Sequence, residues 1–235
     1  LSSSSAASDV YKRQVVKFCN EKYCFEPTKI ICLIRSYAAH AVELGNEVPD
    51  SPRFFLKPPS SLVASGGSVI IPSGVAELHH EIELGVVMAR TTSRIPVDEV
   101  PDHILGYIPM LDITARDIQE KAKRMGLPWT EAKGYDTFAP AGYMTTSAEG
   151  LDWRGRRIWL EVNGELRQDG STDQLIWSVE RIISDISNVM TLCRGDIIMT
   201  GTPSGVGSLV DGDHVKGGIE GLGLVEVYVK NASRG

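Results

Sequence analysis

Two glutamates separated by a single residue, Glu81 and Glu83, lie in the segment 78–85, and Asp112 follows a second apolar segment. In an extended chain alternate side chains point to the same side, so the two glutamates share one face while apolar side chains line the other. Carboxylates that come close repel each other unless a cation, a proton or bulk water separates their charges. The three acids predict a site for one divalent cation or, as the alternative, a half-buried strand with solvated glutamates.

The oxygen-only character of this set indicates which ion it would hold. Three carboxylates without a thiolate or a cluster of imidazoles favour a hard cation, Mg²⁺ or Mn²⁺ rather than Zn²⁺. Octahedral coordination leaves three positions open for oxygen atoms of a substrate and for water. Because three carboxylates and a dication leave a net charge of about −1, an anionic substrate needs further positive charge, for which Lys133 and Arg116 are the candidates.

A histidine and a glutamate three residues apart, His40 and Glu43, form a second constellation. In a helical turn their side chains are neighbours, so Glu43 could orient the imidazole of His40 and stabilise its charge. Such a pair can act as a general base that activates water. The alternative is an ordinary surface histidine with a nearby acid.

The segment 200–207 is rich in glycine and contains Pro203. It resembles an anion cradle, in which backbone N–H groups and the Thr202 hydroxyl could receive a carboxylate. The alternative is a plain turn between two strands. The segment lacks the Gly-Lys-Ser/Thr ending of a nucleotide-binding loop and does not match a Gly-x-Ser-x-Gly nucleophile elbow, so neither of those functions is supported.

Six motifs occur in order along the chain. They are Arg-Ser-Tyr-Ala-Ala-His at 35–40, Phe-Leu-Lys-Pro at 55–58, His-His-Glu-Ile-Glu-Leu-Gly at 79–85, Leu-Asp-Ile-Thr-Ala-Arg-Asp at 111–117, Gly-Leu-Pro-Trp at 126–129 and Thr-Gly-Thr-Pro-Ser-Gly-Val-Gly at 200–207. With them the chain resembles the fumarylacetoacetate hydrolase family, and most of all its small single-domain branch of acylpyruvases and oxaloacetate decarboxylases. The resemblance runs from about Lys29 to about Val229.

The resemblance implies a role for each candidate residue. The metal ligands would be Glu81, Glu83 and Asp112, whereas the neighbouring His79 and His80 would support the site or the fold. The catalytic residues would be His40, which activates water with the help of Glu43, and Lys133, which stabilises the developing oxyanion. The substrate-binding residues would be Arg35, Arg116, Gln119 and Thr202. Ser36 stands where the commoner motif form has asparagine, which leaves the His40–Glu43 pair intact but could alter the local backbone.

The implied function is metal-dependent cleavage of a carbon–carbon bond in short β-keto 2-oxo acids, through a metal-stabilised pyruvate enolate. Acylpyruvate hydrolysis would give pyruvate and a carboxylic acid, and oxaloacetate decarboxylation would release CO₂ without attack by water. Keto–enol tautomerisation of oxaloacetate, or isomerisation of a related 2-oxo diacid, is an alternative from the same site. A second alternative, of another class, is a non-catalytic domain that binds anions.

Short strands and few helices are expected to position these residues. Apolar runs at 30–34 and 68–71 suit buried strands, and Asn163-Gly164 within 159–168 is a strong hairpin signal. Residues 196–200 and 222–229 read as late strands, and apolar residues at helical spacing predict a structural helix over 178–191. The resemblance implies a β-rich α+β fold, a mixed-sheet β-roll of the fumarylacetoacetate hydrolase C-terminal-domain type, usually assembled as a homodimer.

Asp112 is expected at a junction between a strand and a helix. Thr114 can cap that helix with Asp117 at the capping-box position, and the helix would end at about residue 125, before Gly126. Three side chains on one helical face could then look into the cavity that holds the acids: Arg116, Gln119 and Lys123. The resemblance favours this placement for the first two, and Lys123 is interpreted as solvated surface.

Composition sets the remaining bounds. The 235 residues, 42% of them hydrophobic, can bury a substantial core as one domain or two small ones. A net charge of −6 argues against nucleic-acid binding, and no apolar run reaches the roughly 18 residues of a membrane span. The four cysteines lack zinc-type pairs and are too few for a disulfide scaffold, which suits a reducing compartment.

The first 14 residues are rich in serine and alanine and are interpreted as a disordered tail or a cloning or translation scar, with a targeting remnant as the alternative. We expect a flexible N-terminal segment over residues 1–28 and a catalytic domain over residues 29–232. The expected location is mitochondrial or cytoplasmic. The expected partners are a small-molecule 2-oxo acid and a second copy of the chain, without nucleic acid or membrane.

Overall fold

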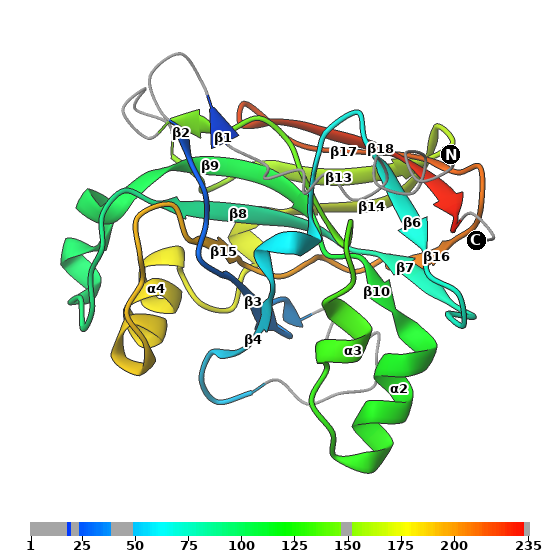
Figure 1. Ribbon diagram of the computed structural model, residues 1–235. Helices are drawn as coiled ribbons and strands as arrows, with labels where there is room; N and C mark the ends of the chain where they lie inside the picture. Colours follow the sequence, from blue (N-terminus) through cyan, green and yellow to red (C-terminus); the bar gives the residue numbers. More distant parts are fainter. Residues whose placement is uncertain (1–17, 20–23, 39–48, 147–151, 233–235) are drawn as a thin grey trace, which may run out of the picture.

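The computed structural model describes residues 18–19, 24–38, 49–146 and 152–232 (Figure 1). The strands in this part of the chain form sheets of eight, five, three and two members. The two-stranded sheet joins β1 (Phe18–Cys19) to β2 (Cys24–Phe25). The other three sheets build the body of the molecule.

The largest sheet is built around a long antiparallel pair, β8 (Ile82–Met88) and β9 (Ile104–Leu111). β15 (Ile197–Met199) pairs antiparallel with β8 and parallel with β3 (Ile30–Ile34), so chain segments from both ends of the sequence meet. The outer members are β4 (Arg53–Lys57) next to β3, β11 (Ala139–Ala141) and β12 (Thr145–Thr146) next to β9, and β5 (Leu62–Ala64) next to β11. Every residue of β8 is buried, as expected for a strand at the centre of the sheet.

The five-stranded sheet has the order β14 (Glu165–Ser171), β13 (Arg157–Val162), β17 (His214–Ile219), β18 (Gly223–Asn231) and β6 (Ser68–Ile71). The turn between β13 and β14 consists of Asn163 and Gly164, with φ angles of 53° and 80°. Both residues tolerate this left-handed conformation, which is why the pair forms the predicted tight hairpin.

A small sheet branches from the large one at the acidic residues. It has the order β10 (Thr114–Ala115), β7 (Leu78–His80) and β16 (Gly207–Leu209). Only Glu81 separates β7 from β8, and only Asp112 and Ile113 separate β9 from β10. The paired strands β8 and β9 are thus continued in the small sheet by their chain neighbours β7 and β10. The acidic residues lie at the fork where the small sheet separates from the large one.

The described part of the chain contains three α-helices: α2 (Arg116–Met125), α3 (Thr130–Lys133) and α4 (Val179–Val189). Figure 1 shows α2 and α3 together beside β10 and α4 apart from them. Short 3₁₀ turns complete the described structure: η1 (Pro59–Ser61), η2 (Val97–His103) and η4 (Thr172–Gln174). No helix in the described ranges is long and apolar enough to cross a lipid bilayer.

The main hydrophobic core collects apolar side chains from both large sheets and from α4. Leu84 and Val86 of β8, Val227 of β18 and Ile183 of α4 all belong to this core, and all four are fully buried. A second cluster, which contains Val87 of β8, covers the other face of the large sheet. Apolar packing on both faces holds β8 in place, so the acidic residues at its start sit on a rigid support.

The β-rich fold of mixed sheets is confirmed, as are the predicted strands, the hairpin at 163–164 and the helix within 178–191. The prediction of a capping box at the start of α2 is wrong. Ala115 occupies the N-cap position without a side-chain hydrogen bond, because Thr114 is extended and paired with His79 in the small sheet. Asp117 instead accepts a hydrogen bond from the backbone N–H of Ala76 at 3.1 Å. The predicted stop is confirmed, since Gly126 ends α2 in a left-handed conformation.

Candidate metal centre and substrate cleft

The fork between the sheets brings Glu81, Glu83 and Asp112 together. One carboxylate oxygen of each lies within 4.8 Å of the others, and the residues are 6%, 1% and 1% exposed. The backbone explains this convergence, because the N–H of Asp112 donates to the carbonyl of Glu81 at 2.8 Å, at the point where β8 and β9 separate. The structure therefore brings the three predicted metal ligands together.

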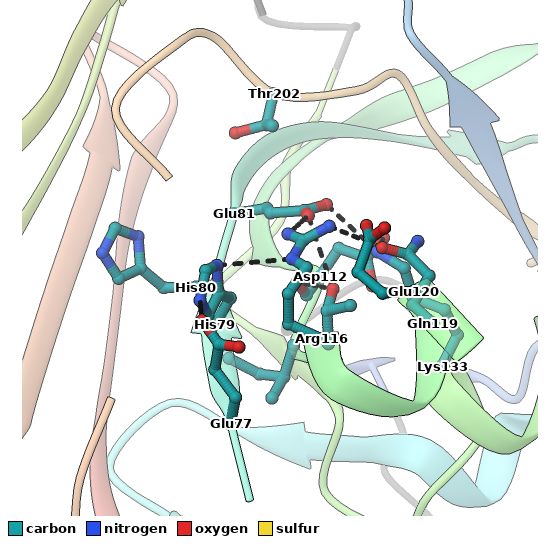
Figure 2. A network of polar contacts seen from close by, with 12 residues as sticks. Glu77, His79, His80, Glu81, Asp112, Arg116, Gln119, Glu120, Lys133 and Thr202 are labelled. Carbon is teal, nitrogen blue, oxygen red and sulfur yellow. Dashed lines mark hydrogen bonds and ion pairs between the residues drawn. The ribbon is translucent and has the colours of Figure 1, made fainter. Parts of the chain in front are cut away.

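Two of the predicted cations lie among these acids (Figure 2). Lys133 Nζ is 3.1 Å from Glu81 Oε2 and 2.6 Å from Asp112 Oδ2. The Arg116 guanidinium forms an ion pair with Glu81 and donates to Gln119 Oε1 at 2.5 Å. Lys133 comes from the end of α3 and Arg116 from the start of α2, so the two helices supply two positive charges of the site.

Lys57 is a third buried cation, which the sequence analysis did not assign to the site. Its Nζ lies 2.7 Å from Asp112 Oδ1. It also donates to the carbonyls of Ile113, Lys133 and Phe138 at 3.0, 2.7 and 2.9 Å. Burial lowers the pKa of this amine, against the opposing effect of Asp112. One signal could have found it: strand alternation places Lys57 on the same side of β4 as Phe55, which lines the cleft.

The acids and cations balance in number. Three buried carboxylates face Lys57, Lys133 and Arg116, which are 1%, 2% and 6% exposed. Burial, followed by the charges of Asp112 and Glu81, raises the pKa of Glu83 well above its usual value. A bound dication would leave an excess of about two positive charges, which suits a dianionic ligand. The sequence analysis assigned Lys133 and Arg116 to this role, and Lys57 is the one buried cation of the three that it did not include.

The donor atoms fit a hard divalent cation. Among the described residues, Asp112 Oδ1 is buried without a hydrogen-bond donor of suitable geometry, although Lys57 Nζ lies at ion-pair distance. All three candidate ligands are carboxylates, and this combination matches Mg²⁺ or Mn²⁺. Glu81, Glu83 and Asp112 are thus the residues that would hold such an ion.

A cleft opens over the acids, and all four predicted substrate-binding residues line it. Its walls are formed by Leu33, Ile34, Arg35, Phe55, Glu81, Glu83, Asp112, Arg116, Gln119, Lys123, Trp129, Lys133, Gly201 and Thr202. Lys123 belongs to this wall, so its interpretation as solvated surface is corrected. It is half-buried and is held by Glu120 at 2.7 Å and by the Trp129 ring, whose centroid lies 5.8 Å from Nζ.

The segment 200–207 closes the cleft from the side of β15. Gly201 adopts a φ of +97° and donates its backbone N–H to Glu83 Oε2 at 2.7 Å. A Cβ atom on Gly201 would lie 1.8 Å from the hydroxyl oxygen of Ser36, so only glycine fits. Ser36 in turn donates to the carbonyl of Thr200. The neighbouring Arg35 has a φ of 54°, and His40 and Glu43 lie outside the described residues.

The two histidines beside Glu81 contact neighbours other than the three acids. His79 Nε2 lies 2.7 Å from Glu77, and its Nδ1 accepts from Arg116 at 3.3 Å. His80 Nδ1 lies 3.1 Å from Gln168 Oε1, and burial lowers the pKa of His80 to about 4. The supporting role of both residues stays a prediction.

The comparisons with known proteins agree with this architecture. The family model for the fumarylacetoacetate (FAA) hydrolase C-terminal domain matches residues 29–230. The chain belongs to the fumarylacetoacetate hydrolase family. The chain is 47% identical to a mitochondrial oxaloacetate tautomerase of Arabidopsis thaliana, over 86% of this chain and 91% of the relative. It is 45% identical to a mitochondrial oxaloacetate decarboxylase of Dictyostelium discoideum, over 83% and 89%.

A solved structure gives the same result. Fumarylpyruvate hydrolase from Pseudomonas aeruginosa, crystallised with Mn²⁺ and pyruvate, superposes with a TM-score of 0.86. Its sequence is 36% identical to this one, and the match covers 92% of this chain and 95% of the other. The similarity therefore extends over nearly the whole chain.

Proposed function

We propose that this protein is a metal-dependent enzyme that acts on short β-keto 2-oxo acids, by acylpyruvate hydrolysis, oxaloacetate decarboxylation or both. The observation that carries the proposal is the convergence of three buried carboxylates within 4.8 Å at the floor of a cleft with cationic walls. Relatives named for oxaloacetate chemistry, and a similar structure crystallised with Mn²⁺ and pyruvate, support it.

The site residues divide the work of binding. Glu81, Glu83 and Asp112 would hold Mg²⁺ or Mn²⁺, which when bound draws negative charge away from the 2-oxo acid unit. Polar side chains on the cleft wall bind and orient the substrate carboxylate: Arg35, Arg116, Gln119 and Thr202. The Lys133 ammonium, 2% exposed, stabilises the negative charge that develops as the carbon–carbon bond breaks.

In the hydrolytic reaction His40, oriented by Glu43, takes a proton from water, and the water attacks the distal carbonyl. The bond to the pyruvate unit then breaks, its electron pair leaves with the pyruvate enolate, and the proton taken up by His40 is returned to the enolate carbon, so that pyruvate and a carboxylic acid are released. In the decarboxylation CO₂ leaves instead, and no water has to be activated.

Since general-base assistance is worth about 10² to 10⁴ in rate, we expect His40→Ala to reduce acylpyruvate hydrolysis by that range and decarboxylation by less. Equal loss of both rates would mean that the His40 segment positions the substrate.

Keto–enol tautomerisation of oxaloacetate is the second candidate, because relatives that are 47% and 44% identical carry that name. It needs the same binding of the 2-oxo acid unit but breaks no carbon–carbon bond. A third candidate, a non-catalytic domain that binds anions, would keep the cleft without turnover.

One set of assays separates these candidates. The purified chain, with Mg²⁺ or with a chelator, is given acetylpyruvate and oxaloacetate, and pyruvate release and the decay of the enol absorbance are followed. Metal-dependent pyruvate release supports cleavage, whereas metal-dependent enol decay without pyruvate supports tautomerisation. The absence of both would refute the enzyme proposal and leave anion binding. Simple esters should not be cleaved, because they cannot chelate the ion and leave as an enolate.

Location and assembly extend the proposal. Mitochondrial names among the relatives favour the mitochondrial option for this chain. The homodimer expected from the family stays a prediction.

A further inference from the structure

Gln168 contacts both halves of the candidate site although it belongs to the five-stranded sheet. It lies in β14 and has no exposed surface. Its Oε1 accepts from the backbone N–H of Ile82 at 3.0 Å and lies 3.1 Å from His80 Nδ1. Its Nε2 donates to Thr202 Oγ at 2.8 Å and to the carbonyl of Pro203 at 2.9 Å. Every donor and acceptor position of the amide is thus used.

The backbone partners fix the direction of this amide. The N–H of Ile82 can only donate and the carbonyl of Pro203 can only accept, so the amide oxygen faces Ile82 and the amide nitrogen faces Pro203. Thr202 Oγ must therefore act as an acceptor toward Gln168, and its own proton is left for another partner. Thr202 lines the cleft, where a substrate carboxylate is the natural acceptor.

Close packing holds β14 against the loop that carries Thr202. A Cβ atom on Gly205 would lie 2.2 Å from the carbonyl oxygen of Arg167, and one on Gly170 would lie 2.9 Å from Pro203 Cβ. Gly205 also has a φ of +95°, which favours glycine. The loop thus lies directly on the strand, and Gln168 has little freedom to move away from Thr202.

The other end of Gln168 lies at the fork of the sheets. Ile82 stands between the two candidate ligands Glu81 and Glu83, where β7 ends and β8 begins. At this break in the strand pairing Gln168 supplies the acceptor for the N–H of Ile82. One side chain therefore ties the backbone of the acids to the loop of the anion cradle.

We propose that Gln168 is a positioning residue that orients the Thr202 hydroxyl to donate to the carboxylate of the bound 2-oxo acid. It acts through Thr202, without contact with the reacting atoms. This inference rests on the proposed function, because it assumes that the cleft binds a 2-oxo acid.

Gln168→Glu is the sharpest test, because it replaces the amide nitrogen that donates to Thr202 with an oxygen and keeps the oxygen that accepts from Ile82. The introduced carboxylate can still accept from Ile82, but it accepts from Thr202 where the amide donated, and so it withdraws the hydroxyl proton from the cleft. Pyruvate binding to the Mn²⁺-loaded full chain, measured by calorimetry, should weaken about ten- to a hundredfold. Mn²⁺ affinity, measured by electron paramagnetic resonance, should stay within about threefold, since the acceptor for Ile82 remains. Unchanged pyruvate affinity would overturn the proposal.

A double-mutant cycle tests whether the effect passes through Thr202. In a Thr202→Val background Gln168→Glu should weaken pyruvate binding by less than about twofold further, because no hydroxyl is left to orient. In a Thr202→Ser background, which keeps a hydroxyl, Gln168→Glu should again weaken pyruvate binding to the full extent. Additive effects of Gln168→Glu and Thr202→Val would contradict the proposed route.

Two further variants separate this role from folding and from added charge. Gln174→Glu adds the same charge at an exposed position six residues away, where the side chain caps a short turn, and should leave pyruvate binding unchanged. If Gln168→Glu does not fold, Gln168→Met fills similar volume without donors and should show the same loss of pyruvate affinity. Wild-type protein that binds no pyruvate with Mn²⁺ would refute the proposed function. Normal binding by wild type and by both Gln168 variants would refute only the role of Gln168.

Discussion

The three acids differ in how their charges are compensated. Asp112 has a lysine on each oxygen, at 2.7 and 2.6 Å, and Glu81 is paired with Lys133 and Arg116. Glu83 accepts a backbone hydrogen bond from Gly201 and has a raised pKa because it is buried. A bound dication would therefore contribute most at Glu83, because the negative charge of this carboxylate is compensated least among the three acids.

We expect Glu83→Ala to lose Mn²⁺ binding and turnover, because it removes one of the three oxygen ligands. Mn²⁺ binding is measured by electron paramagnetic resonance, and turnover by pyruvate release with and without a chelator. Glu131→Ala, at an exposed position of α3, is the matched control and should bind Mn²⁺ normally. Full activity of Glu83→Ala after exhaustive chelation would end the metal hypothesis.

Lys57→Met should reduce the free energy of unfolding by about 3 to 5 kcal/mol, as is typical when one partner of a buried ion pair is removed. It leaves Asp112 Oδ1 and three backbone carbonyls without the ammonium. Urea unfolding measures the change, and Lys230→Met on an exposed position of β18 is the control. A loss below about 1 kcal/mol would show that water replaces these contacts.

The buried phenol of Tyr107 leads to a prediction about stability at alkaline pH. Burial, together with the charges of Glu180 and Asp152, raises the pKa of its phenol to about 12. The folded state therefore holds this proton more tightly than the unfolded state, whose phenol has a pKa of about 10. The stabilisation is fully present below about pH 10 and is lost as the pH rises toward 12. Tyr107→Phe should flatten that slope in unfolding experiments, and an unchanged slope would assign it to other groups.

At the scale of single elements, α2 carries the cationic face of the cleft. Arg116 lies at the acids, and Lys123, two turns later, lies at the rim beside Trp129. At 1.5 Å per residue the two are separated by about 10 Å along the helix axis. This distance would let Lys123 reach the far carboxylate of a longer diacid, whereas oxaloacetate is too short.

We expect Lys123→Met to raise the KM for fumarylpyruvate about tenfold and the KM for acetylpyruvate by less than about twofold. The reason is that only the former has a second carboxylate. Lys121→Met, on an exposed position of the same helix, should change neither value. Equal changes for both substrates would assign Lys123 to packing against Trp129.

The elements that could be predicted from sequence are those with strong local signals. The Asn163-Gly164 turn and Gly126 fix backbone conformations, and the apolar runs fix buried strands. The start of α2 was missed because pairing of Thr114 with His79 in the small sheet overrides its capping propensity. Gln168 was missed because a polar residue inside a strand does not reveal which distant chain segment supplies its partners. For Lys57, strand alternation indicates its side of β4 but not the acid and carbonyls that it contacts.

At the scale of the whole molecule, the homodimer is open to a direct test. Large apolar side chains remain exposed on a single chain, among them Tyr143 at 80% and Leu224 at 47%. Gly142 packs against the backbone of Leu224, which places these two residues near each other. We expect light scattering to give twice the chain mass and Tyr143→Asp to shift the protein toward monomer. A wild-type monomer at micromolar concentration would contradict the prediction.

The parallel pairing of β15 with β3 has a consequence for biosynthesis. Ile197 pairs with Ile30, and Gly201 binds Glu83 across 118 residues of sequence. The centre of the large sheet and the candidate metal site therefore cannot be completed on the ribosome until residues near 200 have emerged. At about 5 to 20 residues per second, the early strands wait on the order of ten seconds or more for their partner. Until then the apolar edge of β3 is exposed to chaperones and to other nascent chains.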